Sequence, residues 1–451
     1  MSDAAALARM TQPSQLTADE RSVLEAVDAL GPARWTQLLA DLISIPSITG
    51  TAAEADAQRW VAAHLEALGC QVDHWQVDLP VLTSDPDFPG MEAPRDEAWG
   101  TVGVLGGDGV PVLAFQGHID VVPPGDLVQW QGDPFEPRVV GDVMFGRGAC
   151  DMKAGVVANL IAIEALVGSG VQLPGPIAVH SVGGEEDGGL GAFATLKRGH
   201  TANACVITEP TSETVIVATG GALTFTLTVQ GAATHGSTRY EGVSALDVFL
   251  PVYQALQDLE RERNAEVSAL MHDYPIAYPL MVGRVDAGDW SSTVPDRLVA
   301  EGRYGVQIGE DVAVARAALE ERVAEASAAD PWLRDHPVRV AWSGGQFASG
   351  RYLGWPADGA DGTGDDGDHW LLPALQGAVA DVTGGVPRPR GAPYGSDLRL
   401  YNGAGIPSLH YGPGEVRHAH SPIEQVRLPE IGTTARALVL TALRAPTSPN
   451  V

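Results

Sequence analysis

Histidine and acidic side chains follow several apolar stretches of the sequence, in positions from which they could bind a metal ion. His118 and Asp120 follow the apolar run 111–117, and they share one face of an extended chain because side chains alternate along a strand. Asp151 lies in a glycine-bracketed turn ahead of the stretch 153–168. The remaining candidates are Glu185, Glu186 and Asp187 after 177–183, Glu209 after 204–208, and His418 and His420 near the C-terminus. Imidazole nitrogens combined with carboxylate oxygens suit zinc, with cobalt or manganese as alternatives.

Each of these motifs has an ordinary structural explanation when it is taken alone. A carboxylate at a strand end commonly caps a turn, and the acidic run Glu185–Asp187 is typical of a solvated surface. Their coincidence changes the interpretation, because ligands of open α/β sheets bind outside the carboxyl ends of the strands. Acidic groups gathered at such an edge would repel one another without a cation. The sequence carries no P-loop, Gly-x-Ser-x-Gly or His-Glu-x-x-His motif that would favour another chemistry.

Helical and strand-like patterns alternate through the first half of the chain. Residues 52–68 have apolar positions at helical spacing and stop at Gly69, which is typical of a helix end. Such alternation predicts an α/β domain with a buried mixed sheet. The predicted strands are 71–79, 100–106, 111–117, 177–183 and 204–208, and the predicted helices after 52–68 are 153–168 and 189–197.

A different order of elements begins near residue 219. Residues 221–230 alternate between apolar and polar, and the elements that follow complete the order β-α-β-β-α-β of a ferredoxin-like unit. Its other predicted strands are 278–287, 294–306 and 337–343, and its predicted helices are 243–263 and 310–328. We therefore expect an inserted α+β domain at 219–345, and an α/β domain assembled from 1–218 and 346–451 that ends in a helix at 428–443.

The composition restricts the partners and the location of the protein. The 451 residues include 28 basic and 57 acidic ones, which gives a formal net charge of −29. Such a surface repels nucleic-acid backbones and anionic membranes, so we expect neither as a partner. The three cysteines are too few and too scattered for a disulfide framework. With no secretory signal and no apolar stretch of about 18 residues, the sequence predicts a cytoplasmic protein.

Two segments lack a regular pattern. Residues 80–98 are rich in proline and aspartate, and they are predicted either to shape a ligand pocket or to cover a sheet edge. Residues 356–368 are acidic and of low complexity, but they lack the spacing, ending in glutamate, of a calcium-binding loop. We therefore expect a solvated loop there.

Five short motifs occur in an order and spacing that are similar to those of one enzyme family. They are Gly117–Pro123 (GHIDVVP), Gly146–Gly155 (GRGACDMKAG), Gly183–Glu186 (GGEE), Thr208–Pro210 (TEP) and His420–Glu424 (HSPIE). Together they resemble the co-catalytic dizinc metallopeptidases and deacylases that include acetylornithine deacetylase, succinyl-diaminopimelate desuccinylase, the aminoacylases and glutamate carboxypeptidase. The resemblance covers nearly the whole chain. It implies a zinc-peptidase-like catalytic domain with an inserted ferredoxin-like lid or dimerisation domain.

The resemblance also implies a role for each candidate ligand. Asp151 would bridge two zinc ions in each subunit, with cobalt or manganese as alternative metals. His118 and Glu209 would complete one metal site, and Glu186 and His420 would complete the other.

Two further residues would act beside the metals. Glu185 would be the general base that holds the water between the two ions, and Asp120 would be the partner that orients the ligating histidine before it. The family pattern favours His420 over His418 as the ligand, because Glu424 follows His420 by four positions.

Substrate contacts are implied at four positions. His235 resembles the family histidine that reaches the active site of the partner subunit, and Arg303 resembles an arginine that holds a substrate carboxylate. Gly395 and Ser396 resemble a substrate-lining turn. The alternatives are a structural histidine, a surface ion pair and a helix cap at Ser396. The chain departs from the family at Ser292, where asparagine is frequent and would supply a longer polar side chain.

The resemblance implies a homodimeric amidohydrolase that cleaves small N-acylated amino acids or related amines, similar to acetylornithine deacetylase. Glu209 supports this choice, since glutamate there goes with deacylases and carboxypeptidases in the family, and aspartate with dipeptidases and aminopeptidases. The main alternative is a metallo-dipeptidase or carboxypeptidase that acts on small peptides. A non-catalytic dimeric relative is the other alternative, and a missing ligand or a missing Glu185 would favour it.

Overall fold

The computed structural model of the chain describes residues 16–355 and 369–447, so the acidic loop predicted at 356–368 lies outside the described residues. The chain divides into two compact units. Unit 2 consists of Ala218–Gly350 and Gly391–Arg399, and unit 1 holds the other described residues. The inserted domain is predicted at 219–345, and the first segment of unit 2 is Ala218–Gly350. The second segment of unit 2, Gly391–Arg399, is not predicted from sequence.

A mixed sheet has its central strands in unit 1. Its strands are β1 (Gln71–Gln76), β2 (Trp99–Leu105), β3 (Leu113–His118), β6 (Ile177–Val182), β7 (Cys205–Ile207), β8 (Val215–Thr219), β13 (Gly350–Arg351), β14 (Pro389–Ala392) and β15 (Ser408–His410). They lie in the order β1-β2-β6-β3-β7-β15-β8-β13, with β14 paired to β8. Strands β6, β3, β7 and β15 are parallel, whereas β2 is antiparallel to both of its neighbours. Both β3 and β6 are buried along their whole length, as their apolar runs predict.

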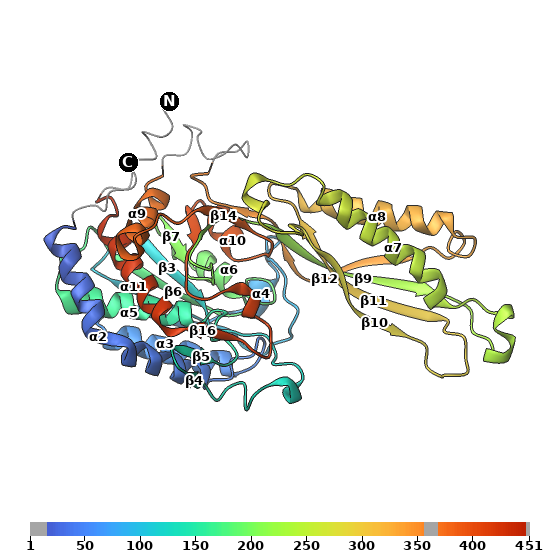
Figure 1. Ribbon diagram of the computed structural model, residues 1–451, viewed down its shortest axis with the longest axis horizontal. Coiled ribbons are helices and arrows are strands. Elements are labelled where there is room, and N and C mark those ends of the chain that lie inside the picture. Colours follow the sequence, from blue (N-terminus) through green and yellow to red (C-terminus); the bar gives the residue numbers. More distant parts are fainter. Residues whose placement is uncertain (1–15, 356–368, 448–451) are drawn as a thin grey trace, which may run out of the picture. The chain divides into compact units, whose positions relative to one another are not determined.

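Helices cover this sheet (Figure 1). The helices of unit 1 are α2 (Ala18–Ile43), α3 (Ala53–Ala67), α5 (Lys153–Ser169), α6 (Leu190–Lys197), α9 (Leu371–Thr383) and α11 (Leu428–Leu443). Helices α2, α5 and α11 pack against one another, and α5 contacts β3, while α3 and α6 contact β2 and β6. None of the described helices is both long enough and apolar enough to span a membrane.

Sequence analysis does not predict helix α2. Gly31 has a left-handed φ of +70° and Pro32 follows it, so two shorter helical segments meet at a kink within this helix. The helix starts at a capping box: the Thr17 hydroxyl accepts the Glu20 N–H at 3.1 Å, and the Glu20 carboxylate accepts the Thr17 N–H at 2.7 Å. The Gly-Pro break interrupts the periodicity by which a helix of this length is recognised.

The strand predicted at 71–79 is shorter than expected. Strand β1 ends at Gln76, and the chain enters the short helix α4 (Leu79–Thr83) because Asp78 caps the N–H of Val81 at 3.2 Å. A three-stranded sheet pairs β16 (Gln425–Arg427), β5 (Val143–Phe145) and β4 (Arg138–Val140). The remaining short helices among the described residues are η1 (Leu127–Gln129), η2 (Gly236–Glu241), η3 (Ala269–Met271), η4 (Val416–His418) and α10 (Leu398–Gly403).

Unit 2 contains a four-stranded antiparallel sheet and two long helices. In chain order the elements are β9 (Gly221–Gln230), α7 (Ala245–Arg263), β10 (Leu280–Ala287), β11 (Arg297–Val306), α8 (Val312–Ala329) and β12 (Arg339–Phe347). The sheet order is β10-β11-β9-β12. Alternate apolar residues of β9 are buried in the core of this unit, namely Leu223, Phe225, Leu227 and Val229. The predicted β-α-β-β-α-β order is therefore observed.

Candidate metal centre

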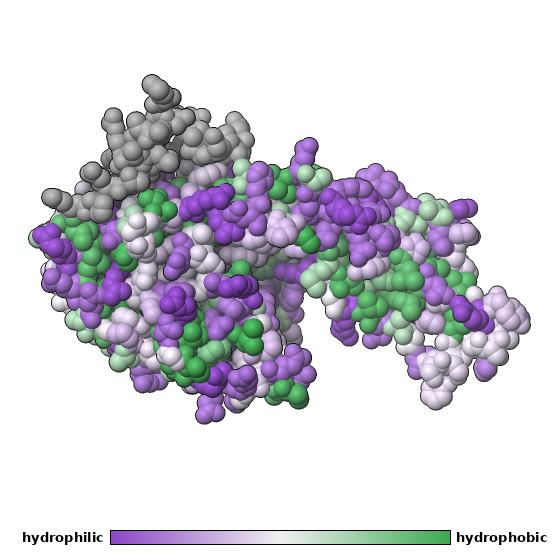
Figure 2. All heavy atoms as spheres, viewed as in Figure 1, coloured by the Kyte–Doolittle hydropathy of each residue, from purple (hydrophilic) through white to green (hydrophobic). Residues whose placement is uncertain are grey.

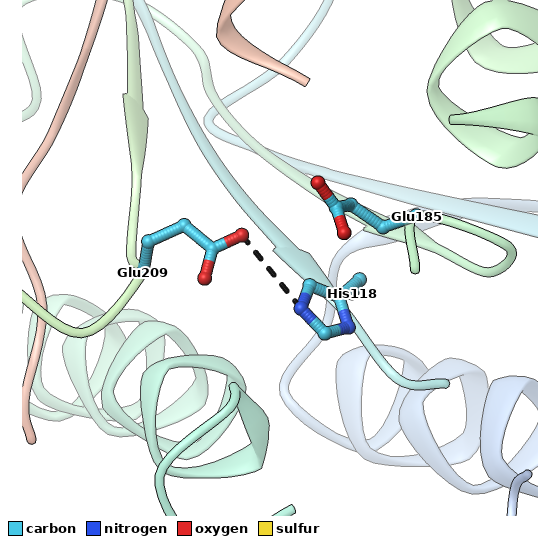
Figure 3. Close-up of side chains that lie close together, drawn as sticks. All are labelled: His118, Glu185 and Glu209. Atoms are coloured by element: carbon cyan, nitrogen blue, oxygen red, sulfur yellow. Dashed lines mark ion pairs between the residues drawn. The ribbon is translucent and has the colours of Figure 1, made fainter. Parts of the chain in front are cut away.

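Strand ends bring the candidate ligands of unit 1 together. Strand β3 lies between β6 and β7 and is parallel to both, so the residues that follow these three strands meet at one edge of the sheet. His118 ends β3, and Glu185 and Glu209 follow β6 and β7. Figure 3 shows these three side chains close together. One possible ligand atom from each of them lies within 4.8 Å of the other two.

Asp151 lies between two histidines. It precedes helix α5, and its Oδ1 lies 3.1 Å from Nε2 of His118, which is itself 3.7 Å from Oε1 of Glu209. The other oxygen, Oδ2, lies 3.5 Å from Nε2 of His420. That same nitrogen lies 3.1 Å from Oε2 of Glu186. The two oxygens of the Asp151 carboxylate thus face two different histidines, and Glu186 lies near both of them.

The structure distinguishes His420 from His418. His418 Nδ1 lies 3.4 Å from the amide nitrogen of Gln425, and its Nε2 lies 3.9 Å from a carboxylate oxygen of Glu415. His420, in contrast, faces the acidic cluster from a backbone with φ of +59°. A left-handed conformation is costly for a residue other than glycine and is kept where the surroundings require it. His420 is therefore the one of the two histidines that faces the acidic cluster, and its role as a ligand stays a prediction.

The acidic cluster raises the proton affinity of both imidazoles. Burial lowers the pKa of His118, but the carboxylates of Glu209 and Asp151 more than offset this and raise it well above its ordinary value. The Glu186 carboxylate is the main cause that raises the pKa of His420 to about 9, with a contribution from Asp151. Protons or bound cations can compensate the acidic groups, and cations displace these protons because metal ligands must be deprotonated. The donor set of imidazoles and carboxylates therefore fits divalent metal ions.

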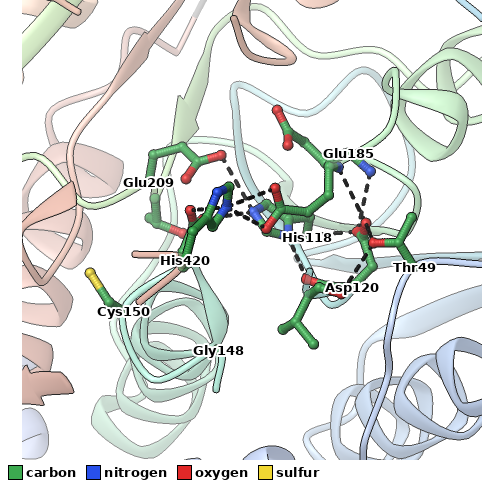
Figure 4. Close-up of polar contacts among 12 residues, drawn as sticks. Thr49, His118, Asp120, Gly148, Cys150, Glu185, Glu209 and His420 are labelled. Atoms are coloured by element: carbon green, nitrogen blue, oxygen red, sulfur yellow. Dashed lines mark hydrogen bonds and ion pairs between the residues drawn. The ribbon is translucent and has the colours of Figure 1, made fainter. Parts of the chain in front are cut away.

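Asp120 contacts both His118 and the backbone of the two glutamates. His118 Nδ1 lies 2.9 Å from the main-chain oxygen of Asp120 and 3.6 Å from its carboxylate, and the predicted role of Asp120 as the partner that orients this histidine stays a prediction. The carboxylate also accepts the backbone N–H groups of Glu185 and Glu186, both at 3.2 Å, and the hydroxyl of Thr49 at 2.9 Å (Figure 4). Asp120 therefore holds the backbone of the two glutamates, and its main-chain oxygen contacts the histidine.

Glu424 organises the turn that carries Asp151. Its Oε1 accepts the N–H groups of Gly148 at 3.0 Å and of Cys150 and Asp151 at 3.1 Å. Its Oε2 pairs with the buried guanidinium of Arg147. Sequence analysis uses Glu424 only to choose between two histidines, and its fixed spacing from His420 is the one signal that could have marked it as a positioning residue.

Two of the predicted substrate residues, His235 and Ser396, make local contacts within unit 2. His235 begins η2, its Nδ1 lies 2.7 Å from the hydroxyl of Ser237, and its backbone forms a β-bridge with Thr293. The Ser396 hydroxyl accepts the N–H of Leu398, the first residue of α10, at 3.2 Å, as the alternative helix-cap interpretation expects. Their roles in substrate binding stay predictions.

The other two surround Phe347, also in unit 2. The Arg303 guanidinium lies 5.7 Å from the centre of the Phe347 ring and donates a hydrogen bond of 2.6 Å to the hydroxyl of Thr224. Gly395 packs so closely on Phe347 that an added Cβ would lie 2.3 Å from the phenylalanine Cβ. Only glycine fits there. Whether these residues bind substrate is a prediction that the contacts do not test.

The chain is similar to known proteins in sequence and in fold. The family model described as peptidase family M20/M25/M40 matches residues 114–444. An N-formyl-4-amino-5-aminomethyl-2-methylpyrimidine deformylase of Halalkalibacterium halodurans is 29% identical over 419 residues, which cover 89% of this chain and 92% of that protein. A succinyl-diaminopimelate desuccinylase of Xylella fastidiosa is 33% identical over 229 residues, which cover 49% of this chain and 55% of that protein.

A solved structure shares the fold. The dipeptidase Dug1p of Saccharomyces cerevisiae has a TM-score of 0.71 at 16% identity, and the match covers 96% of this chain and 99% of that one. At this identity the likeness concerns the fold alone. The family model extends from the strand that ends at His118 to the end of helix α11, which is well over half of the described residues. The chain therefore belongs to peptidase family M20/M25/M40.

Proposed function

We propose that this member of the family is a dizinc deacylase that hydrolyses the amide bond of small N-acylated amino acids or related amines. The observation that carries the proposal is the position of Asp151, whose two carboxylate oxygens face His118 and His420. One zinc ion would be held by His118, Asp151 and Glu209, and the other by Asp151, Glu186 and His420. Such a pair of ions supplies an acidified water and polarises the carbonyl of the amide.

Glu185 is the proposed general base. Its side chain is buried, and a carboxylate oxygen lies within 4.8 Å of the ligand atoms of His118 and Glu209. Its backbone N–H is held by Asp120 at 3.2 Å, so the side chain projects from an anchored position. From there it takes a proton from the attacking water and returns it to the leaving amine.

The matched relatives guide the choice of substrate. The relative that is matched along nearly its whole length removes a formyl group from an amine, and the partly matched one removes a succinyl group. Both leave a free amine, as an enzyme similar to acetylornithine deacetylase would. We therefore place blocked amines first, with formyl, acetyl and succinyl as the candidate acyl groups, and keep small peptides as the alternative substrate.

Unit 2 is the proposed dimerisation module. Leu246, Leu250 and Tyr253 recur at helical spacing on α7 and are exposed, as are Met281 and Val285 on the edge strand β10. Figure 2 shows hydrophobic side chains gathered on the face of unit 2 that α7 and the sheet occupy. A second copy of the chain could bury this surface. We also propose a cytoplasmic location, which the three buried free thiols support.

The test is hydrolysis of a small substrate panel by zinc-loaded protein, with N-formyl, N-acetyl and N-succinyl amino acids beside free dipeptides. Turnover of blocked amino acids, lost in Glu185→Gln with both zinc ions retained, is the expected result. Turnover of dipeptides alone would mean that the enzyme is a dipeptidase and not a deacylase. Two bound zinc ions without turnover of any compound would favour the non-catalytic alternative.

A further inference from the structure

A buried arginine connects the irregular segment after α4 to the loop that carries Glu185. Arg95 belongs to the segment between α4 and β2, and its side chain is only 1% exposed. Its Nη2 lies 2.7 Å from Oδ2 of Asp187. Its Nη1 lies 3.4 Å from Oε1 of Glu54, which belongs to the first turn of helix α3. One guanidinium thus joins three parts of unit 1 that are far apart in sequence.

Asp187 also binds the backbone of the same segment. Its Oδ2 accepts the N–H of Ala93 at 2.9 Å and that of Glu92 at 3.3 Å, in addition to the guanidinium. Asp187 follows directly after Glu185 and Glu186. The segment between α4 and β2 is therefore bound to the loop 183–187, which carries Glu185, through its own backbone and through the side chain of Arg95.

The guanidinium lies against the peptide that leads to Glu185. A Cβ added to Gly184, whose φ is +67°, would lie 2.7 Å from Nη1 of Arg95. A Cβ added to Gly183 would lie 3.0 Å from Oε1 of Glu54. The two glycines allow this close approach, and the arginine and the glutamate in turn leave the loop little room to move.

Arg95 compensates several buried carboxylates. Burial raises the pKa of Glu54 to about 8, and the charge of Asp120 adds to this effect. Burial lowers the pKa of Arg95, but Glu54, Asp187 and Asp120 together raise it above its ordinary value, so the guanidinium stays charged. A lysine could not reproduce these contacts, because a single ammonium group lacks the planar fork that reaches two carboxylates at once.

We propose that Arg95 is a positioning residue that, through Asp187 and Glu54, holds the loop 183–187 so that Glu185 faces the reacting atoms and Glu186 faces the metal. The proposal rests on the proposed function of these two glutamates. The proposal gives the segment 80–98 a role in catalysis, because this segment holds the loop 183–187. The two functions predicted for the segment from sequence, shaping a ligand pocket and covering a sheet edge, do not include this role.

The test compares Arg95→Met and Arg95→Lys with the matched control Arg198→Met. Arg198 also pairs with an aspartate, Asp73, at 2.6 Å, but its side chain is 43% exposed. We would measure kcat and KM of the zinc-loaded enzymes, the zinc affinity by competition with a chelator, and the melting temperature.

A displacement of the base by about 1 Å can lower the rate about 100-fold. We therefore expect Arg95→Met to lower kcat by about that factor with KM within twofold, and to weaken zinc binding about tenfold. Arg95→Lys should recover only part of the loss, and Arg198→Met should match the wild type.

A lower melting temperature with unchanged kcat and zinc affinity would overturn the proposal, because it would reduce Arg95 to a stabilising role. Should the wild type hydrolyse no compound of the panel, the proposed function fails, whereas zinc affinity still tests the positioning role. Should Arg95→Met not fold, Asp187→Asn replaces it, since it keeps an acceptor for the Ala93 N–H and removes the charge. A kcat and zinc affinity of Asp187→Asn within twofold of wild type would likewise overturn the proposal.

Discussion

Glu424→Gln is the substitution whose effect the structure specifies most closely. The carboxylate is buried, with its side chain 1% exposed, and it pairs with Arg147, whose side chain is 2% exposed. Its other oxygen accepts three backbone N–H groups of the turn that carries Asp151. All four of these partners, the guanidinium and the three backbone groups, are hydrogen-bond donors.

Glutamine has nearly the same shape, but its side-chain amide can accept hydrogen bonds at only one of its two polar ends. In one orientation its NH2 group faces the guanidinium of Arg147, and in the other it faces the three backbone N–H groups. Either way donors face donors, and the buried arginine loses its counter-charge. Breaking a buried ion pair on one side costs about 3–5 kcal/mol, so we expect a loss of unfolding free energy of that size.

The assay is urea unfolding of chelator-treated protein, because bound zinc would add its own binding energy to the apparent stability. Glu164→Gln is the matched control, since Glu164 pairs with Arg34 at 3.0 Å but both side chains are partly exposed. The control should cost less than about 1 kcal/mol. Equal losses for Glu424→Gln and Glu164→Gln would refute the reasoning, because burial would then make no difference.

Three further results are expected. His420→Ala should lower the zinc content toward one ion per subunit by elemental analysis, whereas His418→Ala should leave it unchanged, and the reverse outcome would mean that the wrong histidine was assigned. Burial lowers the pKa of His180 to about 3 in the folded protein, whereas the pKa of an unfolded histidine is about 6.5. Between these pH values only the unfolded state binds the proton, so the free energy of unfolding falls as the pH falls. His180→Gln should therefore reduce the slope of the unfolding free energy between pH 6 and 4 by about 1.4 kcal/mol per pH unit. The proposed dimer should dissociate in Leu250→Asp, as measured by light scattering, and a dimer that persists in this variant would place the interface elsewhere.

Several elements and ligands could be predicted because their signals are local. The alternation of β9, the apolar run of β3 and the helix α5 are each visible within a short window of sequence, and a strand or helix extends over such a window. Helix α2 was missed for the same reason, since Gly31 and Pro32 divide its pattern.

Residue types and their spacing were enough to indicate which side chains could bind metal and that several of them follow strands. Parallel strands place such residues at one edge, so His118 and Glu209 could be grouped without coordinates, whereas Asp151, which lies in a turn before helix α5, was assigned to them only through the family resemblance. Residue type and short-range periodicity are enough for this step, because they decide chemistry and local geometry.

The groups that hold these residues in place are visible only in the folded chain. Arg147 and Glu424 are 277 positions apart, and Arg95 and Asp187 are 92 apart. Nothing in a local pattern pairs one buried charge with another at such separations. The same applies to Asp120, whose carboxylate holds two backbone N–H groups. Long-range packing selects these partners, because a buried charge is stable only where the folded chain supplies a matching donor or acceptor.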